Sequence, residues 1–334
     1  MADRYGRRAG LRLFLGLAIL GYLMLAVSSS WILAFAGVVL VMAWSSMASP
    51  TLFAVIGDAL PSERRTLGFS VQSVLRRVPI VVAPFLGGSL IARHGVRGGV
   101  QQALFITVVL ALATVALVSR LQLSLPGPGA RIGPARVWRS LPRALRWLLL
   151  SDILVRMCEG LVDVFLVLYA LDVVGIRPPE YGLLIGVQML TAILGYFPGA
   201  RLAARIGSRP LVIATFVAFG LFPIAVVSAG SLPGLVAAFV VGGLREIGEP
   251  ARKALIVDLA PPDLRARSIG MYYLVRSLSI APAASVGGLL WQVAPALPFH
   301  LAGGFGLLGA IVFAATADRG RVPPKPESPG GRTE

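Results

Sequence analysis

The chain contains ten apolar stretches with few charges inside them, and this pattern limits the folds that it can adopt. A helix needs about 20 apolar residues to cross the ~30 Å hydrocarbon core of a bilayer. In lipid the backbone must satisfy its own hydrogen bonds, so each stretch is predicted to be a helix, and the alternation typical of barrel strands is absent from the sequence. With 56% hydrophobic and 14% charged residues, the sequence predicts an all-α, polytopic membrane protein. The predicted spans are 11–28, 32–57, 67–92, 99–119, 145–172, 180–203, 210–229, 232–258, 267–292 and 297–317.

The distribution of Lys and Arg predicts how the chain is oriented. Six segments on one side of the predicted spans hold 21 basic residues, whereas the opposite loops hold only Arg93, Arg97 and Arg177. Basic residues accumulate on the cytoplasmic side of membrane proteins, so we expect a multi-pass protein of the bacterial cytoplasmic (inner) membrane with both termini in the cytoplasm. The net charge of +16 does not indicate nucleic-acid binding, because the cations are spread over helix ends rather than gathered on one face.

A weak internal repeat relates two parts of the chain. Sliding the sequence by 200 residues places 50–90 on 250–290, and 12 of these 41 positions are then identical. The matches include Asp, Pro and Arg residues and a Gly-Gly pair, which a shared apolar composition would not readily produce. Equivalent loops fall on the same side of the membrane, so we expect parallel repeats related by an axis along the membrane normal. Repeat-related pairs include Asp58 with Asp258, Arg76 with Arg276, Gly87 with Gly287 and Gly88 with Gly288.

Two motifs resemble those of the major facilitator superfamily. Asp3-Arg4-Tyr5-Gly6-Arg7-Arg8 is similar to the core of the loop motif G-x-x-x-D-R-x-G-R-R, which lies between helices 2 and 3 of that family. A second copy ends at Arg209, with Ala204 at the acidic position. Ala83-Pro84-Phe85-Leu86-Gly87-Gly88 resembles the end of the antiporter motif in helix 5, with Ala in place of its first Gly. The resemblance implies the family's fold and secondary transport as the activity.

The resemblance also implies a domain organisation. Residues 1–119 would form an N-terminal half equivalent to the family's helices 3–6, and 145–317 a C-terminal half equivalent to helices 7–12. Between them we expect 120–144 to be a non-helical cytoplasmic linker, and 318–334 to be a disordered cytoplasmic tail. Two spans precede the loop motif in the second half but none in the first. We therefore expect the first two transmembrane helices to be lacking, the alternative being a genuine ten-helix protein.

Charged residues inside the spans are candidate functional residues, because an ionisable group at bilayer depth costs about 2.5–3.5 kcal/mol or more. In span 145–172, four of them follow one another at spacings that place them on one helix face. A second cluster lies in span 232–258. The first cluster is Asp152, Arg156, Glu159 and Asp163, and the second is Arg245, Glu246, Glu249 and Arg252.

We expect these charges to line a pathway for a solute and a proton. An arginine beside a carboxylate stabilises its charged form, so separating the two during a conformational change favours proton uptake. The alternative is that the charges pair within their own helices and hold them together. Asp152 and Arg252, nearer the cytoplasmic ends, are expected to be structural or to snorkel. The predicted pathway assigns proton binding to Glu159 and to Glu246 or Glu249, positive counter-charges or ligands for an anionic solute group to Arg156, Arg245 and Arg276, and further lining to Asp163 and Arg76.

The loop motif suggests a gate. Its acidic residue could accept hydrogen bonds from a helix N-terminus, and its arginines could reach an aspartate at the end of a neighbouring span, which would latch the cytoplasmic side. Positive-inside topology is the alternative explanation for the arginines. The predicted gate comprises Asp3, Arg4, Gly6, Arg7, Arg8 and Asp58 in the first copy and Arg205, Gly207, Arg209 and Asp258 in the second. Gly87, Gly88, Gly287 and Gly288 are expected to allow close helix packing.

Other functional classes find less support in the sequence. A hydrolase motif of the G-x-S-x-G type and a phosphate-binding loop are both absent, so we expect neither an enzyme nor an ATP-driven pump. The one cysteine, Cys158, provides no metal site, and we expect no cofactor and no metal. The sequence predicts a monomeric secondary transporter of a small solute, working by alternating access and coupled to protons. The alternative is a non-transporting or truncated relative that serves as a sensor, a scaffold or a remnant.

Overall fold

A computed structural model describes residues 7–120 and 133–316, and every regular element within these ranges is a helix. The predicted all-α fold is therefore confirmed. Asp3, Arg4 and Gly6 of the predicted gate lie outside the described residues, as does the predicted tail 318–334.

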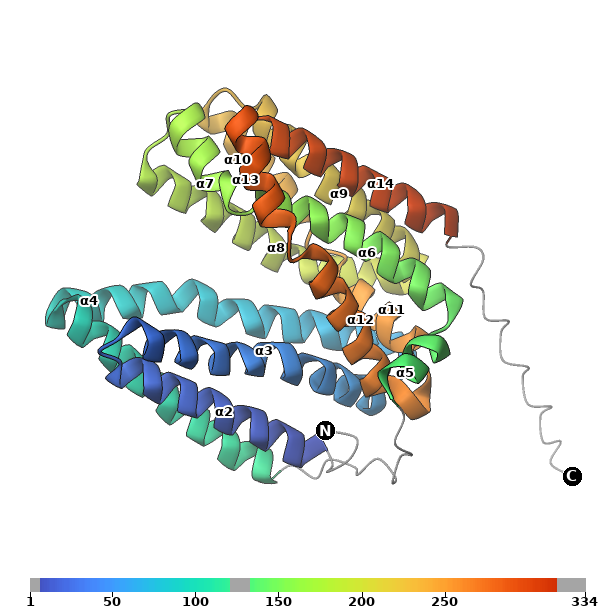
Figure 1. The fold of residues 1–334 in the computed structure, drawn as a ribbon. Coiled ribbons are helices and arrows are strands. Elements are labelled where there is room, and N and C mark those ends of the chain that lie inside the picture. Colours follow the sequence, from blue (N-terminus) through green and yellow to red (C-terminus); the bar gives the residue numbers. More distant parts are fainter. Residues whose placement is uncertain (1–6, 121–132, 317–334) are drawn as a thin grey trace, which may run out of the picture.

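The first group of helices, called the N-terminal bundle below, consists of α2 (Arg7–Val27), α3 (Trp31–Ala59) and α4 (Ser62–Arg120). The long helix α4 reverses direction at Gly95, where φ is 72° and ψ is 170°. Residues with a Cβ rarely adopt this positive φ, so the reversal requires a glycine. The two arms of α4 correspond to the predicted spans 67–92 and 99–119, and Figure 1 shows the reversal at the left end of the molecule.

The second group, called the C-terminal bundle, follows a short helix α5 (Pro134–Ser140). Three of the spans predicted here are built from more than one helical piece, namely 145–172, 232–258 and 267–292. The bundle comprises α6 (Arg143–Val162), α7 (Phe165–Leu168), the π-helix η1 (Tyr169–Val173), α8 (Pro178–Ile206), α9 (Ser208–Ser228), α10 (Leu232–Leu244), α11 (Glu249–Leu259), the 3-10 turn η2 (Pro262–Leu264), α12 (Arg265–Ile280), α13 (Ala283–Val293) and α14 (Leu297–Thr316).

The stretch 120–144, expected to be non-helical, contains α5 and the start of α6, so this expectation is wrong for its second part. Pro134 stands at the start of α5, where its missing N–H would have had no helical acceptor. Val137 and Leu141 are buried, and α5 lies against α12. Burial of these two apolar side chains explains why a segment rich in Pro, Gly and Arg nevertheless forms a helix turn here.

The described helices include several that suit a bilayer. Five helical stretches are long and apolar enough to cross a membrane by length and composition. Two shorter apolar stretches, Leu11–Val27 and Trp31–Met42, lie in the N-terminal bundle. The five long stretches are Arg97–Arg120, Pro179–Ile206, Ser208–Ser228, Pro262–Val293 and Leu297–Thr316.

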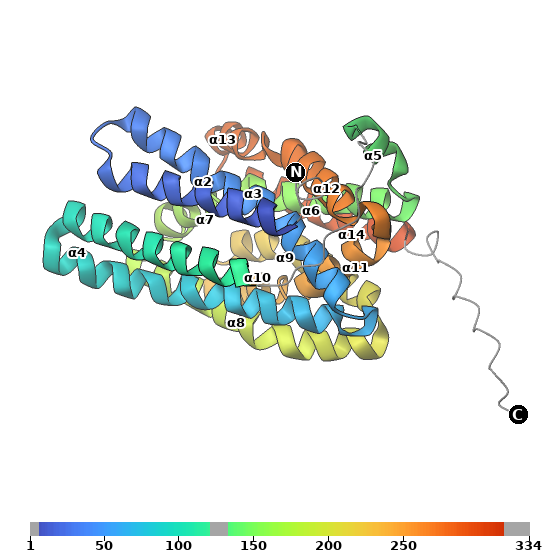
Figure 2. The same cartoon turned by 90° about the horizontal axis from the view of Figure 1, so that it is seen from below.

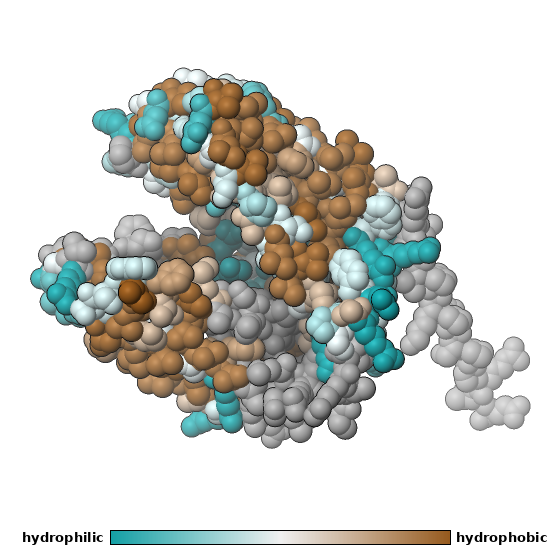
Figure 3. All heavy atoms as spheres, in the orientation of Figure 1, coloured by the Kyte–Doolittle hydropathy of each residue, from teal (hydrophilic) through white to brown (hydrophobic). Residues whose placement is uncertain are grey.

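The two bundles meet at one end and diverge at the other. Figure 1 shows α2–α4 below and α6–α14 above, converging near α5, α11 and α12. At this closed end α4 packs against α11 and α3 against α12, and Figure 2 shows α4 alongside α8. The space-filling view in Figure 3 shows a cleft between the bundles, open at the opposite end and with hydrophilic residues in its depth. The candidate site lies between the helices that meet where this cleft ends.

Candidate functional site

The interruption between α10 and α11 places charged residues between the bundles. Arg245 to Gly248 form a turn that joins the two helices. Ile247 fits against Gly195 and Gly199 of α8, where any Cβ would overlap its side chain. Gly248 lies against the hydroxyl of Thr215 in α9, again with no room for a side chain. These close contacts fix the turn and therefore hold the side chains of Arg245 and Glu246 in place.

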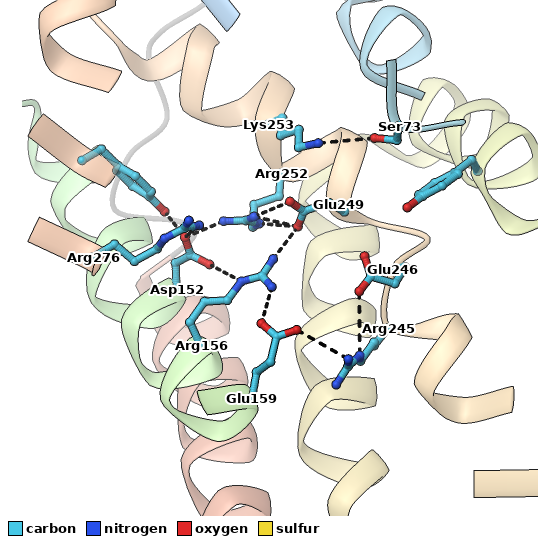
Figure 4. A network of polar contacts seen from close by, with 12 residues as sticks. Ser73, Asp152, Arg156, Glu159, Arg245, Glu246, Glu249, Arg252, Lys253 and Arg276 are labelled. Atoms are coloured by element: carbon cyan, nitrogen blue, oxygen red, sulfur yellow. Dashed lines mark hydrogen bonds and ion pairs between the residues drawn. The ribbon is translucent and has the colours of Figure 1, made fainter. Parts of the chain in front are cut away.

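The predicted face of α6 supplies the first carboxylates. Arg156 donates to Glu159 Oε2 at 2.5 Å on its own helix and to Glu249 Oε2 at 2.9 Å on α11. Its guanidinium also lies 5.1 Å from the ring centre of Phe219. Figure 4 shows Arg156 between the two glutamates. The predicted pairing within α6 is thus present, but the same arginine also links α6 to α11.

A second set of contacts surrounds Asp152. This carboxylate is fully buried and pairs with Arg252, which is 1% exposed. Tyr272 donates its hydroxyl to Asp152 at 2.9 Å, and Arg276 Nη1 lies 3.3 Å away. Arg252 also donates to Glu249 at 2.6 Å. Of the two expected roles, structural or snorkelling, the contacts of Arg252 agree with the structural one, because its guanidinium pairs with two carboxylates in the interior.

Arg245 is held less tightly than the other arginines. Its Nη2 lies 3.5 Å from Glu159 Oε1, and its Nε lies 3.8 Å from Glu246 Oε1. The guanidinium carbon lies 5.0 Å from the ring centre of Phe219 and 4.8 Å from that of Phe222. Aromatic faces attract such cations, so the two rings orient Arg245 without neutralising it.

Polar contacts of α4 connect the N-terminal bundle with the C-terminal bundle. Arg77 of α4 forms an ion pair with Glu246, its Nη2 lying 2.7 Å from Oε2, and donates to the hydroxyl of Tyr196 at 2.6 Å. Lys253 Nζ lies 3.2 Å from Gln72 Oε1 and 3.3 Å from Ser73 Oγ. Nearer the closed end, Arg65 of α4 pairs with Asp258 of α11. The charged residues around Asp152, Arg156 and Arg245, together with Arg77 and Lys253, are called the ion-pair network below. The Arg65–Asp258 pair lies apart from this network.

Several predicted site residues occupy other surroundings. Asp163 lies where α6 ends and is exposed, and Arg76 is exposed on α4. The repeat pointed to Arg76, yet its neighbour Arg77 faces Glu246. Consecutive helical residues point about 100° apart, so only one of the two can face the C-terminal bundle.

The residues of the predicted gate are only partly described. The backbone of Arg7 and Arg8 belongs to α2 and that of Asp58 to α3, while Asp258 meets Arg65 of α4. Arg205 is exposed. Gly207, with φ of 88°, joins α8 directly to α9. Helix α9 begins at Ser208, and Arg209 is its second residue. A glycine is required at this turn, which gives the second copy of the motif a structural reason.

The two Gly-Gly pairs differ in their surroundings. A Cβ at Gly287 of α13 would overlap the backbone oxygen of Leu161 and approach Phe165 to 3.0 Å. At Gly288 the nearest atom, also of Phe165, would lie at 3.7 Å, and at Gly87 nothing lies within 4 Å. The surroundings of Gly88 lie outside what the structure describes. Close helix packing therefore needs a glycine at Gly287 but not at Gly87.

Sequence reasoning missed Arg77, Lys253, Tyr196 and Tyr272 as parts of the network. The first two were visible as basic residues inside predicted spans, the same signal that identified Arg245. The tyrosines gave no such signal, because a buried tyrosine is ordinary in an apolar helix.

Comparison with known proteins identifies the relatives of this chain. The family model described as Major Facilitator Superfamily matches residues 1–151 and 148–334. An uncharacterized MFS-type transporter, MJ1317, from Methanocaldococcus jannaschii is 26% identical over 103 residues, which are 30% of this chain and 26% of that protein. The quinolone resistance protein NorA from Staphylococcus aureus is 24% identical over 154 residues, 46% of this chain and 39% of NorA. The chain thus matches between a quarter and two fifths of the length of these curated relatives.

Solved structures share the fold at low sequence identity. The Escherichia coli fucose:proton symporter FucP superposes with a TM-score of 0.79 at 15% identity, covering 96% of this chain and 86% of FucP. The human organic anion transporter MFSD10 gives a TM-score of 0.81 at 17% identity, covering 93% and 78%. A bacterial homologue of the iron transporter ferroportin, in an outward-facing state, gives 0.72 at 18% identity, covering 95% and 85%.

Proposed function

The chain belongs to the major facilitator superfamily, and from this premise we propose that it is a secondary active transporter that moves a small solute by alternating access. It is a multi-pass membrane protein with the fold of known transporters of that family. The observation that carries the proposal is the ion-pair network, which joins both bundles where the cleft between them ends. Charged groups at such depth are expensive, and their usual role is to line a solute or proton pathway.

The contacts between the bundles would form and break during the cycle. Arg65 with Asp258, Lys253 with Ser73, and Arg77 with Glu246 hold α4 against the C-terminal bundle at the closed end. Closing the opposite end by rocking one bundle against the other would pull these partners apart. The described arrangement then corresponds to one of two alternating states, with the cleft accessible from the open end.

Proton coupling would use the carboxylates of the network. Glu159, and Glu246 or Glu249, each lie beside at least one arginine. An arginine that moves away no longer stabilises the carboxylate's charge, so the carboxylate takes up a proton more readily. FucP, which shares the fold, is described as a fucose:proton symporter, and its description supports this part of the proposal by analogy.

The membrane and orientation follow from the charge pattern. With 21 basic residues on one side and three on the other, the closed end would face the cytoplasm together with both termini, in the inner membrane of a bacterium. The open cleft would then face outward, and the predicted monomer would carry the pathway between its own two bundles. The solute would be small and either polar or charged, because arginines and carboxylates of the network lie between the two bundles.

Proteoliposomes test the proposal. The purified chain is reconstituted with a pH-sensitive dye inside, a pH gradient is imposed, and solutes are added one at a time. We expect at least one solute to change the internal pH through its coupled movement. Glu159→Gln should abolish this signal, because an amide cannot carry the proton. Glu180→Gln is the matched control, since Glu180 pairs with the exposed Arg177 at the start of α8, outside the network.

The test also separates the transporter from its alternative. A chain that inserts and folds normally but moves no solute under any gradient would support a non-transporting sensor or scaffold instead. Equal signals from Glu159→Gln and from the unchanged chain would remove Glu159 from the pathway while leaving transport itself in place.

A further inference from the structure

The ion-pair network contains more positive than negative side chains. Five arginines and four carboxylates are joined by its ion pairs, which leaves one positive charge in excess. Lys253, which contacts the neutral Gln72 and Ser73, adds a second positive charge beside them. A charge held in a low-dielectric interior without an opposite charge is destabilising, and a bound anion relieves this. The five arginines are Arg77, Arg156, Arg245, Arg252 and Arg276, and the carboxylates are Asp152, Glu159, Glu246 and Glu249.

The unmet hydrogen bonds of the network are mostly those of donors. Among the described residues, the buried Nε atoms of Arg156, Arg245 and Arg276 have no hydrogen-bond acceptor, whereas Asp152 Oδ1 is the one fully buried network acceptor without a donor. Arg156 Nε lies 3.9 Å from that oxygen, so a small shift would satisfy both. A guanidinium can only donate, so the remaining unmet groups would be satisfied by an acceptor such as an anionic oxygen.

Arg245 is the cation best placed to receive an anion. Its shortest contact to a carboxylate, at 3.5 Å, is longer than the shortest contacts of Arg156 and Arg252. It stands in the turn before α11, whose first N–H groups add partial positive charge at the same place. The rings of Phe219 and Phe222, 5.0 and 4.8 Å from its guanidinium carbon, keep the guanidinium oriented when a partner leaves.

The partner that can leave is Glu159. Its side chain is 24% exposed, whereas those of Glu246 and Glu249 are 11% and 13% exposed and that of Asp152 is fully buried. Glu159 is therefore the most exposed carboxylate of the network. It is also the one that holds Arg245 at 3.5 Å.

Resting on the proposed function, the geometry points to a solute with a carboxylate or phosphate group that binds Arg245 when Glu159 takes up a proton. The proton goes onto a carboxylate oxygen of Glu159, which becomes neutral and ends its ion pairs with Arg245 and Arg156. The anionic oxygen of the solute then replaces the lost carboxylate. A monoanion and one proton together carry no net charge, so their combined passage would be electroneutral.

Other charged groups around Glu159 belong to the same equilibrium. Arg156 and Asp163 share its helix, Arg245 approaches from the turn, and Glu249 lies on α11 beyond Arg156. Asp163 is exposed at the end of α6 and could also take up a proton. Asp163→Asn therefore belongs among the variants, and it should leave the pH dependence of binding unchanged.

Thermal unfolding of the purified chain in detergent tests this inference with matched probes at pH 6 and pH 8. The pairs are lactate with lactamide, benzoate with benzamide, and glycerol 3-phosphate with glycerol. We expect at least one anion to raise the unfolding midpoint by about 2 °C or more, and its neutral partner to have no effect. Its affinity should be tighter at pH 6, by about tenfold per pH unit for one linked proton. The carboxylate and phosphate pairs show which anionic group is preferred.

Variants assign the effect to residues. Arg245→Gln should weaken anion binding at least tenfold, Arg245→Lys should restore part of it, and Arg177→Gln, an exposed arginine outside the network, should not change it. Glu159→Gln should keep binding but lose its pH dependence. Stabilisation by neutral probes, stabilisation by no anion, full binding by Arg245→Gln, or unchanged pH dependence in Glu159→Gln would each overturn the inference.

The same probes separate this inference from the proposed function. Flux of a neutral solute driven by a pH gradient, with no anion binding at Arg245, would leave the transporter standing and remove the anion site. Anion binding linked to a proton, with no flux in proteoliposomes, would support the site and contradict transport.

Discussion

The two bundles differ in where their charge and their packing lie. In the C-terminal bundle, the buried share of an apolar 18-residue window is 50% in Ser208–Ser228, 44% in Leu297–Thr316, 33% in Pro179–Ile206 and 11% in Pro262–Val293, whereas in Arg97–Arg120 of the N-terminal bundle it is 6%. All four carboxylates of the network come from the C-terminal bundle, and α4 contributes Arg77, Gln72 and Ser73. Glu63 of the N-terminal bundle is exposed.

This difference suggests a division of labour. The C-terminal bundle has a dense core around a prearranged set of carboxylates, so it can hold a site in fixed geometry. The N-terminal bundle meets that site through polar contacts of α4, from Arg77, Gln72 and Ser73, and through the apolar side chains of Phe53 and Phe69. In alternating access, the C-terminal bundle would keep the site in fixed geometry while the N-terminal bundle exchanges its contacts to that site.

The largest expected effect tests whether the C-terminal bundle depends on its buried charges. Asp152→Asn leaves Arg252 and Arg276 without their shared carboxylate in the interior, and it should lower the free energy of unfolding by about 3–5 kcal/mol. Thermal unfolding in detergent measures the change. Glu180→Gln, which removes a carboxylate at a helix start, should cost about 1 kcal/mol or less. Similar losses in both variants would mean that the buried pairs contribute no special stability.

A smaller effect compares the bundles at repeat-related positions. Gly287→Ala places a methyl group against the backbone oxygen of Leu161 and should destabilise the protein by about 1–3 kcal/mol through overpacking. Gly87→Ala meets no atom within 4 Å and should be neutral or stabilising by up to about 1 kcal/mol, because alanine favours a helix. Unfolding midpoints of the two variants under the same conditions decide the matter. Equal destabilisation would show that the bundles pack alike at this motif.

The sequence was sufficient to predict the family, the all-α fold class and the helical character of the ten spans. Runs of apolar residues and the repeat carry that information, because they depend on composition over many positions. The face of α6 that carries Asp152, Arg156 and Glu159 was predictable for the same reason: the helical period fixes which side chains share a face.

What the sequence could not provide is the choice between neighbouring residues and the position of the helix breaks. Arg76 and Arg77 are equally basic, and only the packing of α4 against Glu246 selects the second. The break before Glu249 depends on Gly195 and Gly199, nearly 50 residues away, which receive Ile247. Burial of Arg252 likewise depends on Asp152 being opposite, which is a tertiary fact and not a local one.

The smallest effect concerns the contact between the bundles at the closed end. Asp258→Asn removes the ion pair with Arg65 while leaving Arg65 its hydrogen bonds to the carbonyls of Gly57 and Leu60, both at 3.1 Å. The side chains of the pair are 15% and 34% exposed, so its loss should cost about 1 kcal/mol or less. That cost would shift the ratio of closed to separated ends by up to about fivefold, because 1.4 kcal/mol corresponds to tenfold.

Spin labels on cysteines introduced at Pro61 and Pro262 would measure this shift as a change in the distribution of distances across the closed end. Pro262 is exposed at the start of η2, Pro61 is exposed just before α4, and the native Cys158 is buried, so the labels should attach to the introduced sites. Glu63→Gln is the control, because Glu63 accepts a hydrogen bond from the adjacent Ser62 rather than from the other bundle. A distribution that moves in the control as much as in Asp258→Asn would mean that overall charge, and not the contact between the bundles, holds this end closed.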